Sequence, residues 1–177
     1  MLKKIITITT ATALLCLVGI IVYADSNGVF LQDNDAAMNL VDKYFSSVMK
    51  IYTSDGSKVS FRGIVKQGCD FWYYNEYNNK DIVSRCAKGS SMEVTKANCS
   101  ITYDSIKYSN KTYTIEATVT RNLQYPKMNL SEISVFKHTI LIEQNGSEMY
   151  IINDESVRES AEYIPLEESE TDDTPEL

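Results

Sequence analysis

The side chains of this sequence that could do chemistry are a single histidine and a few cysteines. His138 is the only imidazole in the chain. A histidine that acts as a general base needs a carboxylate that orients it or a nucleophile that it activates, and no carboxylate stands at a spacing that identifies such a partner. The sequence therefore favours a packed histidine on a strand face and no catalytic residue. An alternative is that Cys86 and His138 form a Cys–His nucleophile. The sequence favours a structural role for Cys86, as a buried or oxidised thiol.

An aromatic cluster is the strongest candidate for a ligand site. Phe71 is followed directly by Trp72, Tyr73 and Tyr74, and Tyr77 comes three residues later. Aromatic walls suit sugars, peptides or apolar ligands, so we predict that a ligand contacts Trp72, Tyr73, Tyr74 and Tyr77. The alternative is that the cluster is ordinary core with a few surface tyrosines.

The sequence contains no recognisable site for a cofactor or a metal ion. There is no C-x-x-C pair, and one histidine is too few for the usual zinc patterns. A phosphate loop, a dinucleotide fingerprint and a calcium loop of alternating acids are also missing from the sequence. We therefore expect neither a cofactor nor a metal.

The first 24 residues have the order of a secretory signal. Lys3 and Lys4 form a basic start, residues 5–22 are uncharged and largely apolar, and a small residue, Ala24, ends a cleavage site. We expect cleavage after Ala24 and a location outside the cell or on the outer face of its membrane. The alternative is an uncleaved anchor, because the apolar run is about the minimum length for a membrane span.

Removal of that segment takes Cys16 away and leaves three cysteines. An odd count in an oxidising compartment implies one disulfide and one free thiol. If residues 70–86 are one helix, Cys69 and Cys86 lie about 25 Å apart at 1.5 Å per residue, well beyond the roughly 7 Å that a disulfide spans between Cα atoms. The strand that follows returns toward the helix start at roughly 3.3 Å per residue. We therefore predict a Cys69–Cys99 disulfide and a free Cys86, while the pairing stays open.

The negative charge is concentrated at the end of the chain. Residues 159–177 contain eight acidic side chains and no basic one, whereas residues 25–158 contain sixteen acidic and fifteen basic side chains. A near-neutral body offers no electrostatic footprint for nucleic acid. We predict a solvated, disordered acidic tail over 159–177; a docking or cation-binding segment is the alternative.

Two helices are predicted after a flexible lead-in at residues 25–32. Asp33 or Asn34 can cap the first helix, and the second covers residues 70–86, with Gly89 suited to its C-terminal cap. Apolar side chains spaced by three and four residues form one stripe on the first helix: Ala37, Leu40, Val41, Tyr44, Phe45, Val48 and Tyr52.

Antiparallel strands are predicted for the second half of the chain. Period-two patterns place strands at 101–105, 113–120, 135–143 and 149–152, with a short extra strand at 58–65 before the second helix. Asn145-Gly146 is a strong hairpin signal, residues 122–132 are expected to form a loop or distorted strand end, and residues 153–155 to close the last strand. Helices followed by a meander predict one α+β domain over residues 33–158, with helices packed on a curved antiparallel sheet.

The final hairpin resembles the end of a known module. Residues 138–146 and 150–155 resemble the N-terminal module that precedes the catalytic part of secreted bacterial amidase-domain proteins. The first helix, the strand pair around Ile101–Val119 and this hairpin come in the same order. The resemblance covers residues 34–157 and implies a cystatin-like, nuclear-transport-factor-two-like cone. An acidic tail stands where the amidase segment would begin, so no catalytic residue is carried over.

These observations predict a secreted, non-enzymatic binding or interaction module at the bacterial cell envelope. Its partner would be a small ligand or an envelope protein or glycan, and it would contact a membrane only through an uncleaved signal segment. Two alternatives remain. One is a small polyketide-cyclase-like enzyme with a tyrosine-lined cone pocket, and the other is an interaction or inhibitor protein that uses its open sheet face and tail.

Overall fold

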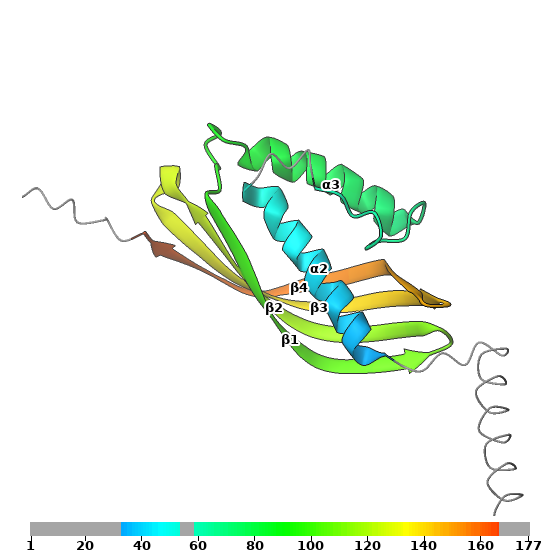
Figure 1. The fold of residues 1–177 in the computed structure, drawn as a ribbon. Coiled ribbons are helices and arrows are strands. Elements are labelled where there is room, and N and C mark those ends of the chain that lie inside the picture. Colours follow the sequence, from blue (N-terminus) through cyan, green and yellow to red (C-terminus); the bar gives the residue numbers. More distant parts are fainter. Residues whose placement is uncertain (1–32, 54–58, 167–177) are drawn as a thin grey trace, which may run out of the picture.

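Two helices lie on one face of a bent, four-stranded antiparallel sheet (Figure 1). The computed structural model describes residues 33–53 and 59–166; the predicted signal, the lead-in and tail residues 167–177 lie outside this part. Its elements are α2 (Asn34–Thr53), α3 (Asp70–Cys86), β1 (Lys96–Ser109), β2 (Thr112–Tyr125), the 3-10 helix η2 (Pro126–Met128), β3 (Leu130–Asn145) and β4 (Glu148–Pro165). The sheet order is β1-β2-β3-β4. This arrangement confirms the predicted α+β class.

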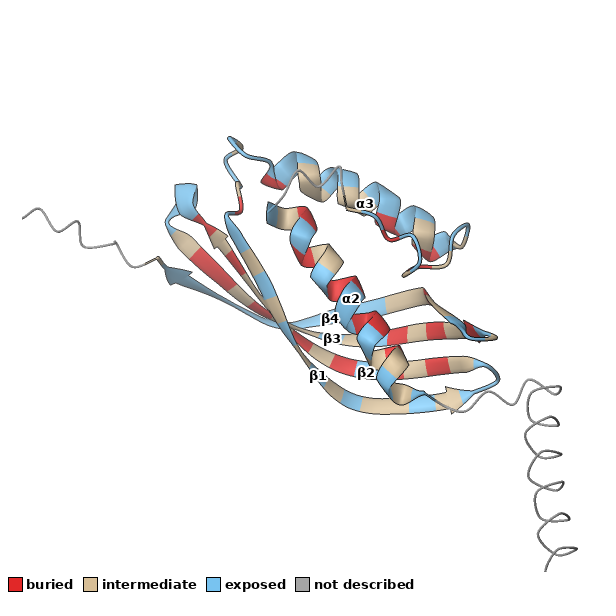
Figure 2. Cartoon of the chain, in the orientation of Figure 1, coloured by how far each residue is buried: buried red, intermediate tan, exposed pale blue. Residues whose placement is uncertain are grey.

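Helix α2 is the inner helix and begins at the predicted cap. The Ala36 N–H donates to Oδ1 of Asp33 at 2.8 Å, which satisfies one free N–H of the first turn. The Asp33 N–H donates to the Tyr113 hydroxyl at 2.7 Å and so ties the cap to β2. Figure 2 shows buried residues on the side of α2 that faces the sheet. They are Ala37, Leu40, Val41, Tyr44, Phe45, Met49 and Ile51.

Helix α3 is the outer helix and buries much less of its surface. The prediction of one continuous helix is confirmed, since α3 runs from Asp70 to Cys86. Only Phe71, Asn75 and Cys86 are buried along it, so one narrow stripe holds it against the rest of the domain. None of the helices in the described part is long and apolar enough to cross a membrane.

The strands alternate as period two requires, and their inner faces carry the core. On β3, Ile140 and Ile142 are fully buried and lie opposite Ile115 and Tyr113 of β2. His138 shares their face, as predicted, because it is two residues from Ile140. The Asn145-Gly146 turn is also confirmed: Gly146 has φ +69°, a conformation that glycine adopts without steric cost.

A β-bulge in β4 changes which side chains face the helices. Ile151 pairs with Ile142, but the next partner of β3, Leu141, pairs with Asn153 rather than Ile152. The extra residue shifts the alternation by one position. Asp154 therefore lies opposite the buried Ile140 and faces the helices. In an unbroken register it would face the opposite side of the sheet.

Strand β4 is longer than predicted, which corrects two boundaries. Residues 153–155 continue the strand instead of closing it, and residues 160–165 of the predicted tail pair with β3. Residues 122–132, predicted as a loop or distorted strand end, are the ends of β2 and β3 joined by η2. The outer half of β4 is exposed and is held mainly by main-chain pairing, so acidic side chains are tolerated there. The described domain therefore extends to Pro165 rather than to residue 158.

The predicted strand at 58–65 is wrong where the structure describes it. The N–H groups of Ile64 and Val65 both donate to the Phe61 carbonyl at 2.9 Å, so the chain turns there. Gly63, with φ +79°, accommodates the turn. The segment then meets β4: the Lys66 N–H donates to the Ile151 carbonyl, and the Ile151 N–H donates to the Ile64 carbonyl.

The predicted Cys69–Cys99 disulfide is absent, because the two residues lie at opposite edges of the sheet. Cys69, Cys86 and Cys99 all have free thiols. The Cys69 thiol lies beside β4, 3.9 Å from the Ile152 carbonyl oxygen. Cys99 lies on β1, three strand spacings of about 4.8 Å away. That separation is about twice what a disulfide can span.

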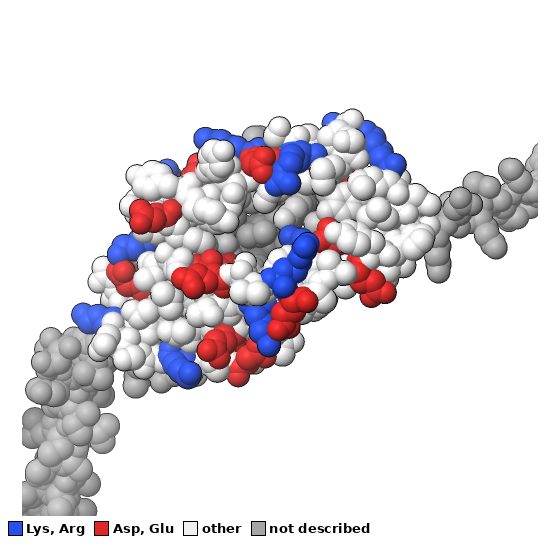
Figure 3. Space-filling model, turned by 180° about the vertical axis from the view of Figure 1, so that it is seen from behind, with Lys and Arg blue, Asp and Glu red and all other residues white. Residues whose placement is uncertain are grey.

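Charged side chains of both signs are interspersed on the surface. Figure 3 shows Lys and Arg side chains close to Asp and Glu side chains on the face seen from behind. Ion pairs such as Lys137–Glu159, at 2.9 Å, contribute to this mixing. This face has no stripe of one sign that a phosphate backbone could follow.

We expect Ile140→Ala to lower the free energy of unfolding by about 2–5 kcal/mol, because it removes a fully buried side chain and leaves a cavity. Thr139→Ala is the matched control, because Thr139 is the next residue along β3 and its side chain is exposed. This substitution should change stability by less than about 0.5 kcal/mol. Urea unfolding followed by circular dichroism measures both. Equal effects would contradict the assigned faces of β3.

Glu93 should stabilise the connection between α3 and β1 in a pH-dependent way. The Gly89 N–H donates to its carboxylate at 2.8 Å, and Lys127 lies 3.2 Å away. These contacts lower the pKa of Glu93. A lowered pKa stabilises the fold above the ordinary value of about 4.3, and the effect is lost as the pH falls below it. Glu93→Gln should therefore lower Tm at neutral pH, and the difference should vanish in acid. A difference independent of pH would contradict this.

Candidate functional site

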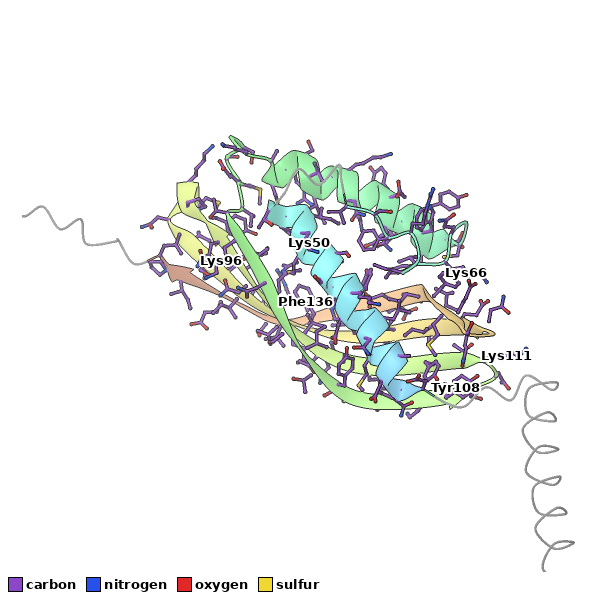
Figure 4. All side chains as sticks on the ribbon, viewed as in Figure 1. Lys50, Lys66, Lys96, Tyr108, Lys111 and Phe136 are labelled. Carbon is purple, nitrogen blue, oxygen red and sulfur yellow. The ribbon has the colours of Figure 1, made fainter. Side chains whose placement is uncertain are left out.

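A cleft in the described part of the chain lies between α2, α3 and the inner face of the sheet. Its volume is about 240 Å³. Figure 4 shows Phe136 on the sheet beside the middle of α2. Ring-bearing residues form much of the cleft wall: Tyr44, Phe45, Tyr52, Phe71, Tyr74, Phe136 and His138. Polar side chains also line it: Asn75, Asn78, Asn79, Arg121, Asp154 and Ser156.

A histidine–carboxylate pair lies in this cleft. Nδ1 of His138 is 2.8 Å from Oδ1 of Asp154, and the two side chains are only 10% and 7% exposed. A carboxylate oxygen accepts hydrogen bonds, so the contact places the proton of a neutral imidazole on Nδ1. Histidine on a strand face was predicted, but its carboxylate partner was missed. Only the bulge at Ile152 turns Asp154 toward His138, and no sequence spacing reveals it.

Tyr44 of helix α2 lies next to this histidine–carboxylate pair. Its hydroxyl donates to Oδ1 of Asn75 at 3.4 Å, and Asn75 is oriented by donating to the Phe71 carbonyl at 2.9 Å. Burial raises the pKa of Tyr44 well above its ordinary value, and the charge of Asp154 and hydrogen bonding to it raise the pKa further. The phenol therefore keeps its proton beside the buried carboxylate.

Arg121 lines the cleft, but its charge is already matched. Its guanidinium donates to Oε1 of Glu132 at 3.1 Å and to the Tyr52 hydroxyl at 2.9 Å. The group also lies over the rings of Tyr52 and Phe136, at 5.5 and 4.9 Å from their centroids. Tyr125 donates to the other carboxylate oxygen of Glu132 at 3.3 Å. The charge of Arg121 is thus compensated by Glu132, while its buried Nε–H has no hydrogen-bond acceptor among the described residues.

The predicted aromatic ligand residues are divided between different surroundings. Tyr74 lines the cleft and stacks on Phe71, with the ring centroids 6.4 Å apart. Trp72 is partly buried and packs against the main core. Tyr73 and Tyr77 are 64% and 76% exposed on α3, and neither lines this cleft. The cluster thus contributes Tyr74 to the site, while Tyr44, His138 and Asp154 come from other elements.

The structure does not bring together the Cys86–His138 pair considered as a nucleophile. Cys86 belongs to a second small core with Val94, Leu123 and Tyr125, and it lines a different cavity from His138. Burial raises the pKa of its thiol. A thiol that keeps its proton is a poor nucleophile, which is consistent with a structural role.

Comparisons with known proteins place the chain in no family. No family model matches its sequence, and no curated protein matches it. Within the described ranges, no group of three or more His, Cys, Asp or Glu side chains is arranged to hold a metal ion.

Tyr44 should make the fold sensitive to alkali. Above about pH 10 the phenol ionises in the unfolded chain but stays protonated in the folded protein, because burial raises its pKa. Stability therefore falls as the pH rises, by about 1.4 kcal/mol per pH unit for one such group. In urea unfolding between about pH 9 and 11, Tyr44→Phe should show a shallower decline than wild type. Tyr77→Phe, at an exposed position, is the control; equal slopes for both variants would contradict this reading.

Proposed function

We propose that the protein is an exported, non-enzymatic binding module that takes a small ligand into the cleft between α2, α3 and the sheet. The observation that carries this proposal is the combination of aromatic walls with polar groups that lack partners. Among the described residues, no hydrogen bond is made by the side chains of Asn78, Asn79 or Ser156, all of which line the cleft. Sites for small ligands commonly combine such walls with a few polar groups.

The location follows from the predicted signal segment. Cleavage after Ala24 would release the domain outside the cell or at the outer face of its membrane. The ligand would then be a small molecule or part of an envelope protein or glycan. A long helix held in a bent sheet supports a relationship to the cystatin-like, nuclear-transport-factor-two-like cone. By the same resemblance we propose a stand-alone relative of the module found in amidase-domain proteins.

A small enzyme of the polyketide-cyclase-like kind is the second candidate. The observation that favours it is the sequence of contacts from Tyr44 through Asp154 to His138, because it provides a possible base beside a protonated phenol. The two functions differ in what happens to the ligand. A binding module releases its ligand unchanged, whereas an enzyme converts it.

Binding in the cleft can be tested with three probes of different chemistry: glucose, phenol and benzoate. We expect at least one of them to shift the amide NMR signals of Phe45, Tyr74 and Ser156. Tyr74→Ala should weaken that binding by about fivefold, because it removes part of the aromatic wall.

Tyr77→Ala is the matched control for that experiment. It removes another exposed tyrosine of α3 that does not line the cleft, and it should leave the affinity unchanged. Loss of binding in Tyr77→Ala with none in Tyr74→Ala would move the site to the outer face of α3. Binding of no probe would contradict the proposed function.

A further inference from the structure

We propose that Nε2 of His138 accepts a hydrogen bond from a hydroxyl or N–H group of the ligand, and that Asp154 fixes the imidazole in the tautomer this requires. The inference deepens the proposed function and rests on it. It specifies the ligand class as a small, uncharged ring compound that carries a hydrogen-bond donor.

The tautomer follows from the contact with Asp154. A neutral imidazole has one N–H, and the Nδ1 atom that lies 2.8 Å from the carboxylate must carry it. Nε2 is then left with a lone pair and can only accept. The carboxylate thus converts a ring that could bind a donor or an acceptor into one that selects donors.

The surrounding side chains hold the ring in place. The Phe45 ring packs edge-on against His138, with centroids 4.9 Å apart and an interplanar angle of 81°. The fully buried Ala117 is the direct neighbour of His138 on β2, and Ser156 is its neighbour on β4. Tyr44 also lies close to the Asp154 carboxylate, so Asp154 has both an imidazole and a phenol beside it. An acceptor fixed in this way has little orientational freedom to lose when a ligand binds.

Nε2 itself has no partner in the part of the chain that the structure describes. The His138 side chain is nine-tenths buried and lines the cleft. Nε2 is not one of the fully buried, unpartnered atoms of the described residues, so it is accessible from the cleft. A donor brought by a ligand would satisfy this atom.

The charges around the cleft disfavour an anionic ligand. Asp154 contributes a negative charge beside His138, and the positive charge of Arg121 is paired with Glu132 at 3.1 Å. A ligand carboxylate would meet a lone pair on Nε2 and no uncompensated cation among the lining residues. The volume of about 240 Å³ sets the size, because an engineered cavity of about 150 Å³ holds benzene. A single ring with one or two substituents therefore fits.

The tautomer can be observed directly because the chain contains one histidine. In protein labelled with ¹⁵N-histidine, long-range ¹H–¹⁵N spectra show which ring nitrogen carries the proton. They are recorded at a pH high enough that a further rise no longer changes the spectrum, so that the imidazole is neutral. We expect the Nδ1–H form in wild type, its loss in Asp154→Leu, and its retention in Asp154→Asn, which keeps an acceptor oxygen. Glu155→Gln is the matched control, because this next carboxylate lies opposite the exposed Thr139. The Nε2–H form in wild type would overturn the inference.

Ligand selectivity is tested with phenol, toluene and benzoate, which share one ring and differ in the polar group. Phenol should bind about tenfold more tightly than toluene, as one hydrogen bond allows, and more tightly than benzoate. It should also shift the ¹⁵Nε2 signal, and Asp154→Leu should abolish its advantage over toluene while Glu155→Gln keeps it. Cleft binding with no preference for phenol would overturn this inference and leave the proposed function standing. Binding of no probe, glucose included, would contradict both.

Discussion

A buried carboxylate must be matched by hydrogen-bond donors, and this requirement organises the interior around Asp154. The side chain is 7% exposed and accepts a hydrogen bond from Nδ1 of His138. Tyr44 approaches the same carboxylate from α2, and its hydroxyl also contacts Asn75 of α3. One ionisable group on β4 therefore connects both helices to β3. The packing of the helices over the sheet must keep these contacts as well as bury the core.

A second polar network lies toward the other end of the cleft. Arg121 and Glu132 pair at 3.1 Å, while Tyr52 and Phe136 cover the guanidinium. Breaking a buried pair leaves an uncompensated charge, so both partners are constrained by each other. In these two networks together, the buried charged groups are mostly paired with other groups of the protein. The polar atoms that remain without partners are therefore informative about what the cleft could bind, and Nε2 of His138 and the buried Nε of Arg121 are two of them.

Local sequence patterns predicted the secondary structure well where neighbouring residues alone decide it, as in an apolar stripe on a helix or a polar helix cap. The apolar spacing that starts at Ala37 identified α2, and Asp33 or Asn34 was predicted as its cap because short polar side chains satisfy the first N–H groups. The structure shows that Asp33 is the cap. The end of the chain was harder. Asn153 and Asp154 favour turns when they are considered alone, but pairing with β3 continues the strand through them. An exposed edge strand has no apolar alternation to mark it, so the strand continuing past Glu159 resembled a solvated tail.

The sequence by itself determined the helices, the hairpin turn at Asn145-Gly146 and the inward face of β3, because these depend on neighbouring residues and on fixed periods. Only the tertiary structure decided which distant side chains meet. The bulge at Ile152 shifts the alternation by one residue and brings Asp154 to His138, and strand order places Cys69 and Cys99 at opposite edges. A phase shift of one residue leaves no trace in a period-two pattern. Contacts across a sheet follow register, and register is set by the packing of the whole domain.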